Sequence, residues 1–177
     1  MLAVGCCIQI ERGPVRDARR SARRKKRNAP VINVIRERLI HAPASAVFAA
    51  LADPANLAGI IPRVRRIELL SQGADHAQVV TYMALGPFGE IRSAGDVRWQ
   101  TDREVVFSAQ RPVPVEARWT LTALASGTQL QAALALDLAP LIGPFAALVP
   151  TAEVAKMVGP DLDAALAAIA RRVEPAS

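Results

Sequence analysis

The chain has 177 residues, of which 51% are hydrophobic and 4% aromatic, and its formal net charge is +6. This length suits one domain with a substantial core, which aliphatic residues and alanine must fill. No apolar run reaches the ~20 residues that a membrane-spanning helix needs, so the sequence predicts no transmembrane helix.

The positive charge is concentrated in a basic leader over residues 1–30. This segment carries nine Lys or Arg and two acidic side chains, a net charge of +7, whereas the other 147 residues carry −1. Blocks of like charge that lack apolar periodicity are typical of disordered segments. We therefore expect a disordered leader over 1–30 and one folded domain over 31–177.

Several roles are compatible with this leader. Its charge could hold it weakly on an anionic membrane or on nucleic acid, although no aromatic residue interleaves with the basic ones. It could be a targeting signal, but its apolar start is short for a signal peptide and follows no basic region. The interpretation we favour is a solvated tail, or an upstream extension of a coding region whose domain begins near Val31.

The two cysteines, Cys6 and Cys7, are adjacent and both lie in the leader. Neighbouring cysteines form a strained disulfide, and the domain contains neither a disulfide framework nor a CxxC motif. The cysteine content therefore predicts the reducing cytoplasm. The preference for Arg over Lys, together with abundant Ala, indicates a bacterial protein.

The domain is expected to begin with a strand and two short helices. Residues 31–41 are rich in β-branched side chains, which favour a strand. In residues 43–53 the apolar side chains recur at helical spacing. Asp53 ends this helix, because the residue before a proline avoids the α region. A second, shorter helix can begin at Pro54 and end before Pro62.

Six strand-like segments follow, separated by short turns: 63–71, 76–86, 88–100, 103–111, 116–124 and 128–138. The alternation is clearest in "EARWTLTAL", where Trp119 and Leu121 share one face and Arg118 and Thr120 share the other. Strands joined by tight turns pair as antiparallel neighbours with one covered face. We therefore expect an α+β fold with an antiparallel sheet of six or seven strands.

A long C-terminal helix over residues 160–173 should cover the apolar face of this sheet. Its own apolar side consists of Leu162, Leu166, Ile169 and Val173. Asp161 would lie in the first turn, where the helix dipole favours negative charge. Residues 151–159 are expected to extend the helix, with a kink or break at Gly159-Pro160.

The segment "IHAPASAVFAALADPANLAGIIPRV", followed by this order of elements, resembles the SRPBCC, or START-like, superfamily, in particular its polyketide cyclase/dehydrase-type members. The "GT" of "SGTQLQ" and the Ala/Leu-rich C-terminal helix fit the same pattern, which covers about residues 31–173. The phrase "DPANLAGIIP" is also similar to a carbon monoxide dehydrogenase group within the same superfamily, where a Gly usually stands at the position of Arg63.

The resemblance implies a helix-grip fold, in which a curved sheet wraps the C-terminal helix and a hydrophobic cavity lies between them. The two short helices would close one end, with Leu57, Ile60 and Ile61 sealing the sheet. We predict eight ligand-binding residues on the covered side: Thr81, Met83, Trp99, Phe107, Ala109, Arg111, Trp119 and Met157. The alternative for each is an ordinary core position.

Arg111 is the expected polar anchor of this site. It shares strand parity with Phe107 and Ala109, so a regular strand would point it toward the covered face. A buried Arg needs a partner, and a ligand carboxylate or phenolate would serve. The alternative is that Arg111 reaches water at the strand end.

Little in the sequence indicates catalysis. The two histidines, His41 and His76, stand at strand ends, and there is no P-loop, GxGxxG, HExxH or nucleophile elbow. We therefore predict no catalytic residue, no metal and no cofactor. The predicted function is non-enzymatic binding or transport of an apolar lipid, quinone or polyketide-like molecule. The alternative is an aromatase/cyclase-type enzyme that uses the same cavity.

Overall fold

The structure, a computed structural model, describes residues 31–84, 89–143 and 150–174. The leader expected over residues 1–30 lies outside the described residues, so its disorder stays a prediction. Within the described ranges, no helix is both long and apolar enough to span a membrane.

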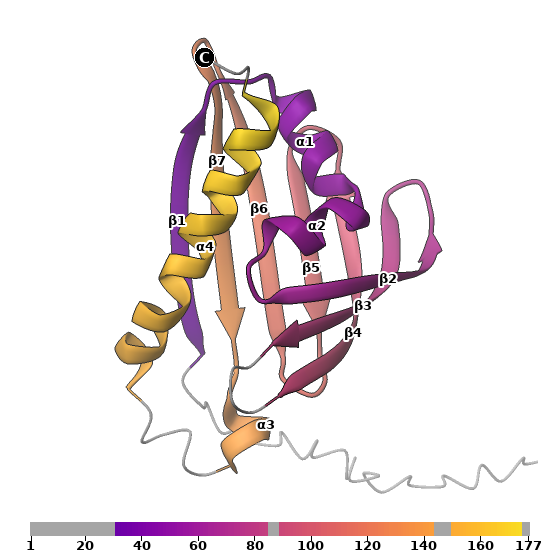
Figure 1. Cartoon of the computed structure of the whole chain (residues 1–177), viewed down its shortest axis with the longest axis vertical. Helices are drawn as coiled ribbons and strands as arrows, with labels where there is room; N and C mark the ends of the chain where they lie inside the picture. Colours follow the sequence, from indigo (N-terminus) through magenta and orange to yellow (C-terminus); the bar gives the residue numbers. More distant parts are fainter. Residues whose placement is uncertain (1–30, 85–88, 144–149, 175–177) are drawn as a thin grey trace, which may run out of the picture.

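Seven antiparallel strands in the described part of the chain form one curved sheet in the order β1-β7-β6-β5-β4-β3-β2 (Figure 1). They are β1 (Ile32–Ile40), β2 (Val64–Gln72), β3 (His76–Ala84), β4 (Glu90–Gln100), β5 (Glu104–Ala109), β6 (Val115–Leu124) and β7 (Gly127–Leu136). Strands β2 to β7 pair with their neighbours in sequence as a meander, and β1 adds to β7 at one edge. The predicted antiparallel sheet is confirmed.

The described helices are α1 (Ala44–Ala52), α2 (Pro54–Ile60), α3 (Ala139–Ile142) and α4 (Thr151–Val173). Figure 1 shows α4 running along the concave side of the sheet, with α1 and α2 beside its C-terminal half. The two short helices after β1 are confirmed, and α4 includes the expected extension before residue 160. The short helix α3 has no counterpart in the sequence prediction. Together these elements form the expected helix-grip fold.

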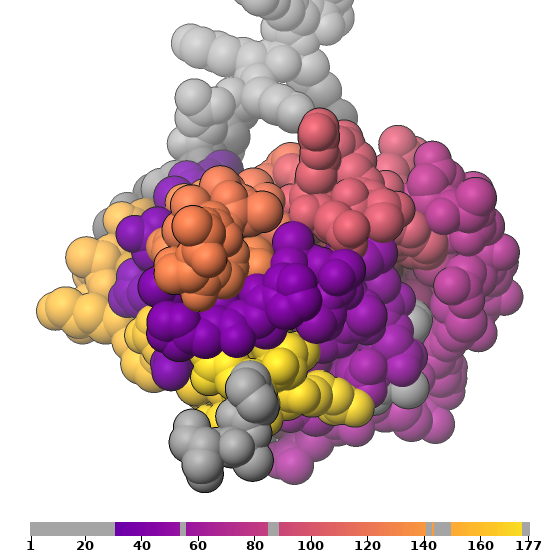
Figure 2. Space-filling view, turned by 90° about the horizontal axis from the view of Figure 1, so that it is seen from above, coloured from indigo at the N-terminus to yellow at the C-terminus, as the bar shows by residue number. Residues whose placement is uncertain are grey.

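One part of the hydrophobic core lies where α1 contacts α4 and the strands β5 to β7. Six large apolar side chains with almost no exposed surface belong to this cluster: Ile40, Val47, Leu51, Leu130, Leu166 and Ile169. Figure 2 looks onto this end and shows α1, in indigo, lying between the orange β6–β7 turn and the yellow end of α4. The two short helices therefore help to close one end of the interior.

The β6–β7 turn interlocks with the end of β1. Gly127 has φ of +139°, and a side chain there would strike the carbonyl oxygen of Ile40, so glycine is required. The neighbouring Thr128 is fully buried, and its hydroxyl donates a hydrogen bond of 2.8 Å to the carbonyl oxygen of Ala42. The "GT" pair of the sequence therefore fixes the first strand against the last.

Candidate functional site

A cavity of about 270 Å³ lies between the sheet and α4. Its lining comes from strands β2 to β7, from α2 and from the middle of α4, and α1 contributes none of it. Among its 25 described lining residues, four carry a hydroxyl or a charge: Arg63, Thr81, Ser93 and Asp161. A small apolar chamber with a few polar groups is the usual form of a small-molecule site.

The two hydroxyl groups of the lining are tied to the sheet backbone. Thr81 Oγ1 donates to the carbonyl oxygen of Ser93 at 3.2 Å, and Ser93 Oγ donates to the carbonyl oxygen of Arg111 at 3.1 Å. Both side chains are buried. Each hydroxyl oxygen retains lone pairs, so each can still accept a hydrogen bond from a ligand.

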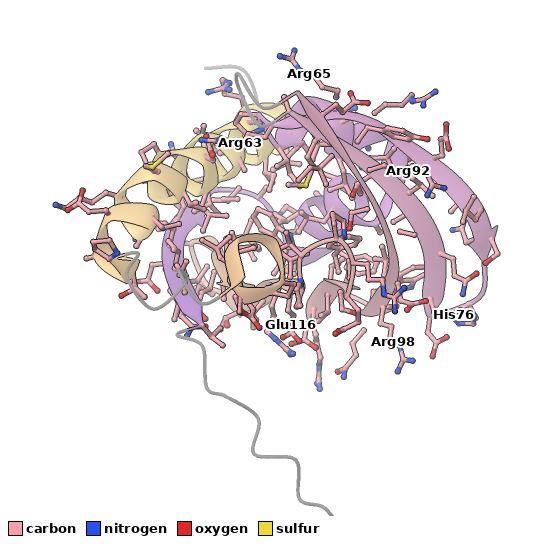
Figure 3. All side chains as sticks on the ribbon, turned by 90° about the horizontal axis from the view of Figure 1, so that it is seen from below. Arg63, Arg65, His76, Arg92, Arg98 and Glu116 are labelled. Atoms are coloured by element: carbon pink, nitrogen blue, oxygen red, sulfur yellow. The ribbon has the colours of Figure 1, made fainter. Side chains whose placement is uncertain are left out.

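The two charged residues of the lining form an ion pair at its solvent-exposed margin. Arg63 Nε donates to Asp161 Oδ2, and 40% of the Arg63 side chain and 25% of the Asp161 side chain are exposed. The carbonyl oxygen of Arg63 accepts a hydrogen bond of 2.8 Å from the Ala84 N–H, which fixes its backbone against β3. In Figure 3, Arg63 lies beside α4, whereas Arg65 projects outward from the molecule.

Four of the eight predicted site residues line the cavity. Thr81 and Met83 come from β3, Phe107 from β5 and Trp119 from β6. Leu57, from the middle of α2, and Ile61, directly after that helix, line it as well. Their side chains meet because the inward-facing positions of neighbouring strands lie side by side, for example Phe107 opposite Ala117.

The other four predicted residues lie outside this lining. Trp99 is partly buried, and its indole N–H donates to the carbonyl oxygen of Ala74 at 3.2 Å. Ala109 is buried but does not line the cavity, and 65% of Met157 is exposed on α4. Arg111 is exposed because β5 ends at Ala109, so strand parity no longer applies two residues later.

The ion pair Arg63–Asp161 was not expected from the sequence as part of the site. Asp161 was assigned to the first turn of a helix that starts at residue 160, but α4 starts at Thr151 and places Asp161 in its middle. There it continues the inward-facing series Val158, Leu162 and Ala165, all of which line the cavity. This i, i+3, i+4, i+7 spacing is the signal that could have found it.

A second hollow, of about 550 Å³, lies on the outer side of the sheet and is polar. Arg118 there donates hydrogen bonds to Glu116 and Glu104, which raise the pKa of its guanidinium. His76 Nδ1 lies 2.8 Å from Asp75 Oδ1, and this hydrogen bond lowers the pKa of the Asp75 carboxyl. Figure 3 shows His76 and Glu116 at this outer surface.

The two hollows differ in the chemistry that they offer. The outer one is larger, but its Arg118 is already paired with Glu104 and Glu116 in contact with water, where ion pairs contribute little. The inner one removes apolar surface from water, which is the main driving force for binding apolar molecules. The inner cavity is therefore the candidate functional site.

The fold resembles several solved structures at low sequence identity. TTHA0849 from Thermus thermophilus is 19% identical, with 80% of this chain and 96% of that chain covered and a TM-score of 0.68. The Zhui aromatase/cyclase from Streptomyces sp. R1128 is 20% identical, with 81% and 93% covered and a TM-score of 0.66. A STAR-related lipid transfer protein from Xanthomonas axonopodis is 16% identical, with 77% and 82% covered and a TM-score of 0.59.

These similarities show the shared fold and leave the activity open, because an aromatase/cyclase and a lipid transfer protein are both among them. A comparison with curated protein sequences finds no match. The model of a family described as "Polyketide cyclase / dehydrase and lipid transport" matches residues 31–174, which include every described strand and helix. The chain therefore belongs to the polyketide cyclase/dehydrase and lipid transport family.

Proposed function

We propose that the protein binds one apolar small molecule, without chemical conversion, in the cavity between the sheet and α4. The observation that carries the proposal is the lining itself, in which 21 of 25 described residues bear neither a hydroxyl nor a charge. The volume of about 270 Å³ lies just below the ~300 Å³ at which typical ligand pockets begin. It suits a compact molecule of two or three rings, such as a quinone or polyketide-like compound, better than a long-chain lipid.

The aromatase/cyclase alternative has less support from the same lining. Acid–base catalysis needs a side chain that can take up or release a proton next to the reacting atom. Among the described lining residues, the one carboxyl group is Asp161, and it is held by Arg63. His41 and His76 are exposed and lie outside the lining. A binding or transport role fits this chemistry better.

The same proposal covers the domain boundaries, the basic leader and the cellular compartment. The binding unit comprises residues 31–177, and the basic leader over 1–30 makes at most weak electrostatic contacts with anionic membranes or nucleic acid. The protein works in the reducing cytoplasm, since its two cysteines both precede the binding unit.

The proposal is tested with N-phenyl-1-naphthylamine, a neutral probe whose fluorescence rises in apolar surroundings. We expect the full chain to bind it with a Kd in the micromolar range, about −8 kcal/mol, as suits one small apolar ligand. Ala117→Trp should abolish this binding, because the indole would occupy the cavity that Ala117 lines. Native mass spectrometry of protein purified from its own host would then give the mass of the natural ligand.

The matched control is Thr122→Trp, which adds the same side chain at an exposed position of the same strand. It should leave the affinity for the probe unchanged. Circular dichroism would show that both variants keep the fold. If folded Ala117→Trp still binds the probe like the wild type, the binding site lies elsewhere and the proposal is wrong.

A further inference from the structure

The guanidinium of Arg63 has more hydrogen-bond donors than acceptors in its surroundings. Arg carries five N–H donors in a planar fork. In the described part of the chain, its one hydrogen-bonded side-chain partner is Asp161, which takes the Nε–H. The two terminal NH₂ groups, with four donors, therefore remain for a ligand or for water.

Arg63 is also the one cationic side chain among the described residues of the cavity lining. Val64 follows Arg63 directly and pairs with Met83 of β3. Val158 lies one helical turn before Asp161 on α4. The apolar side chains of Val64, Met83 and Val158 all line the cavity. Apolar neighbours of this kind lower the local dielectric constant and strengthen a charge–charge interaction. Arg63 thus offers a positive charge held in place by Asp161, next to apolar side chains and within reach of water.

We propose that Arg63 is the anchor for an anionic head group, so that the ligand is an amphipathic acid with its apolar body against Phe107 and Trp119. A carboxylate or phenolate would accept hydrogen bonds from the terminal NH₂ groups while Nε–H stays on Asp161. Two-point binding of a carboxylate by a guanidinium is among the stronger hydrogen-bonding arrangements in proteins. This proposal rests on the binding function proposed above and adds the chemical class of the ligand.

Asp161 limits the strength of this anchor and orients it. Its Oδ2 holds the Nε edge of the guanidinium, which fixes the plane of the fork relative to α4. Its negative charge also offsets part of the attraction that Arg63 exerts on a second anion. Removal of the Asp161 charge should therefore raise the affinity for an acid, whereas removal of the Arg63 charge should lower it.

The test uses three naphthalene probes of the same shape: 2-naphthoate, the neutral 2-naphthamide and the cationic 2-naphthylmethylammonium. The full chain should bind the naphthoate most tightly. Arg63→Gln should weaken naphthoate binding by about tenfold, the loss expected for hydrogen bonds to a charged group, and change naphthamide binding less than about twofold. Asp161→Asn should strengthen naphthoate binding by roughly two- to fivefold.

Arg65→Gln is the matched control, because Arg65 has the same charge two residues away but is exposed and projects outward. It should leave the affinities for all three probes within about twofold, since charges in water are largely screened. The double variant Arg63→Gln/Asp161→Asn removes the ion pair without leaving either charge unpaired. It should bind naphthoate and naphthamide alike, which keeps the test valid if Arg63→Gln alone is poorly folded.

Two outcomes would overturn the anchor. If Arg63→Gln weakens naphthoate and naphthamide equally, Arg63 acts through packing and not through charge. If the cationic probe binds best and Asp161→Asn abolishes its binding, Asp161 is the anchor and the ligand is an amine. In both cases apolar probes still bind, so the proposed function would stand while this inference fails. If neither these probes nor N-phenyl-1-naphthylamine binds the wild type, the proposed function itself is wrong.

Discussion

The two ends of the interior are built from the same sheet and the same helix, yet one is filled and the other is hollow. Toward the C-terminal end of α4, Leu166 and Ile169 meet Val47 and Leu51 of α1 and are at most 2% exposed. Two turns earlier along α4, Val158 and its neighbours face a cavity of about 270 Å³.

The difference arises from what lies opposite the helix. At the filled end α1 inserts its own apolar face between α4 and the strands. At the hollow end α1 contributes nothing to the wall and α2 contributes Leu57, while small side chains such as Ala117 and Ala165 form another part of it. The cavity is therefore a local property of a few positions, which single substitutions can close or enlarge while the fold persists.

The largest expected effect compares two leucines one turn apart on α4. Leu166→Ala should lower the free energy of unfolding by about 3 kcal/mol, because it leaves a void in a packed core. Leu162→Ala should cost about half as much, since Leu162 already borders the cavity and lacks neighbours on one side. Urea denaturation of both variants measures the difference. Equal losses would show that the two ends are packed alike.

A smaller effect is expected from the opposite substitution, which enlarges one side chain in the packed core and one in the cavity wall. Ala132 is 1% exposed and does not line the cavity, so Ala132→Leu should destabilise the fold by about 2 kcal/mol through overpacking. Ala117→Leu fills empty space and should range from neutral to about 1 kcal/mol stabilising. Thermal melting of the two variants checks this. A stable Ala132→Leu would mean that the core around Ala132 has spare room.

The smallest effect concerns one hydroxyl at each end. Thr128→Val should cost about 1 kcal/mol, because the carbonyl oxygen of Ala42 loses its donor in a fully buried site. Thr81→Val should cost less than about 0.5 kcal/mol, since water in the cavity can replace the lost bond to Ser93. Chemical denaturation at matched pH measures both. A larger loss for Thr81 would indicate that its hydroxyl holds β3 and β4 together.

The strands could be predicted from sequence because their signal is local. The alternation of "EARWTLTAL" over residues 116–124 predicted the strand observed at Val115–Leu124 and the inward position of Trp119. In this strand apolar side chains alternate with polar ones, so the pattern can be recognised without knowledge of distant contacts. The same holds for the two short helices, because Pro54 ends the first helix just before it and begins the second.

The polar part of the site could not be predicted in this way. The choice of Arg111 depended on extending strand parity past Ala109, where the strand has already ended. The charged pair that does line the cavity joins Arg63 and Asp161, which are 98 residues apart. Helical spacing could have placed Asp161 on the inward face of α4. Its pairing with Arg63 depends on the packing of α4 against α2, about which hydrophobic periodicity carries no information.

Pro160 stands inside α4, directly after Gly159. Proline has no N–H, so the helical hydrogen bond to the carbonyl oxygen of Lys156 cannot form there. Arg36 of β1 packs over Gly159 and fastens the helix at this point, whereas Val158 just before it belongs to the cavity wall. A larger ligand that pushes against Val158 therefore pushes against a helix that lacks one backbone hydrogen bond at this point. The size of the ligand that the cavity accepts therefore depends on the stiffness of α4 around Pro160 as well as on the side chains that line the cavity.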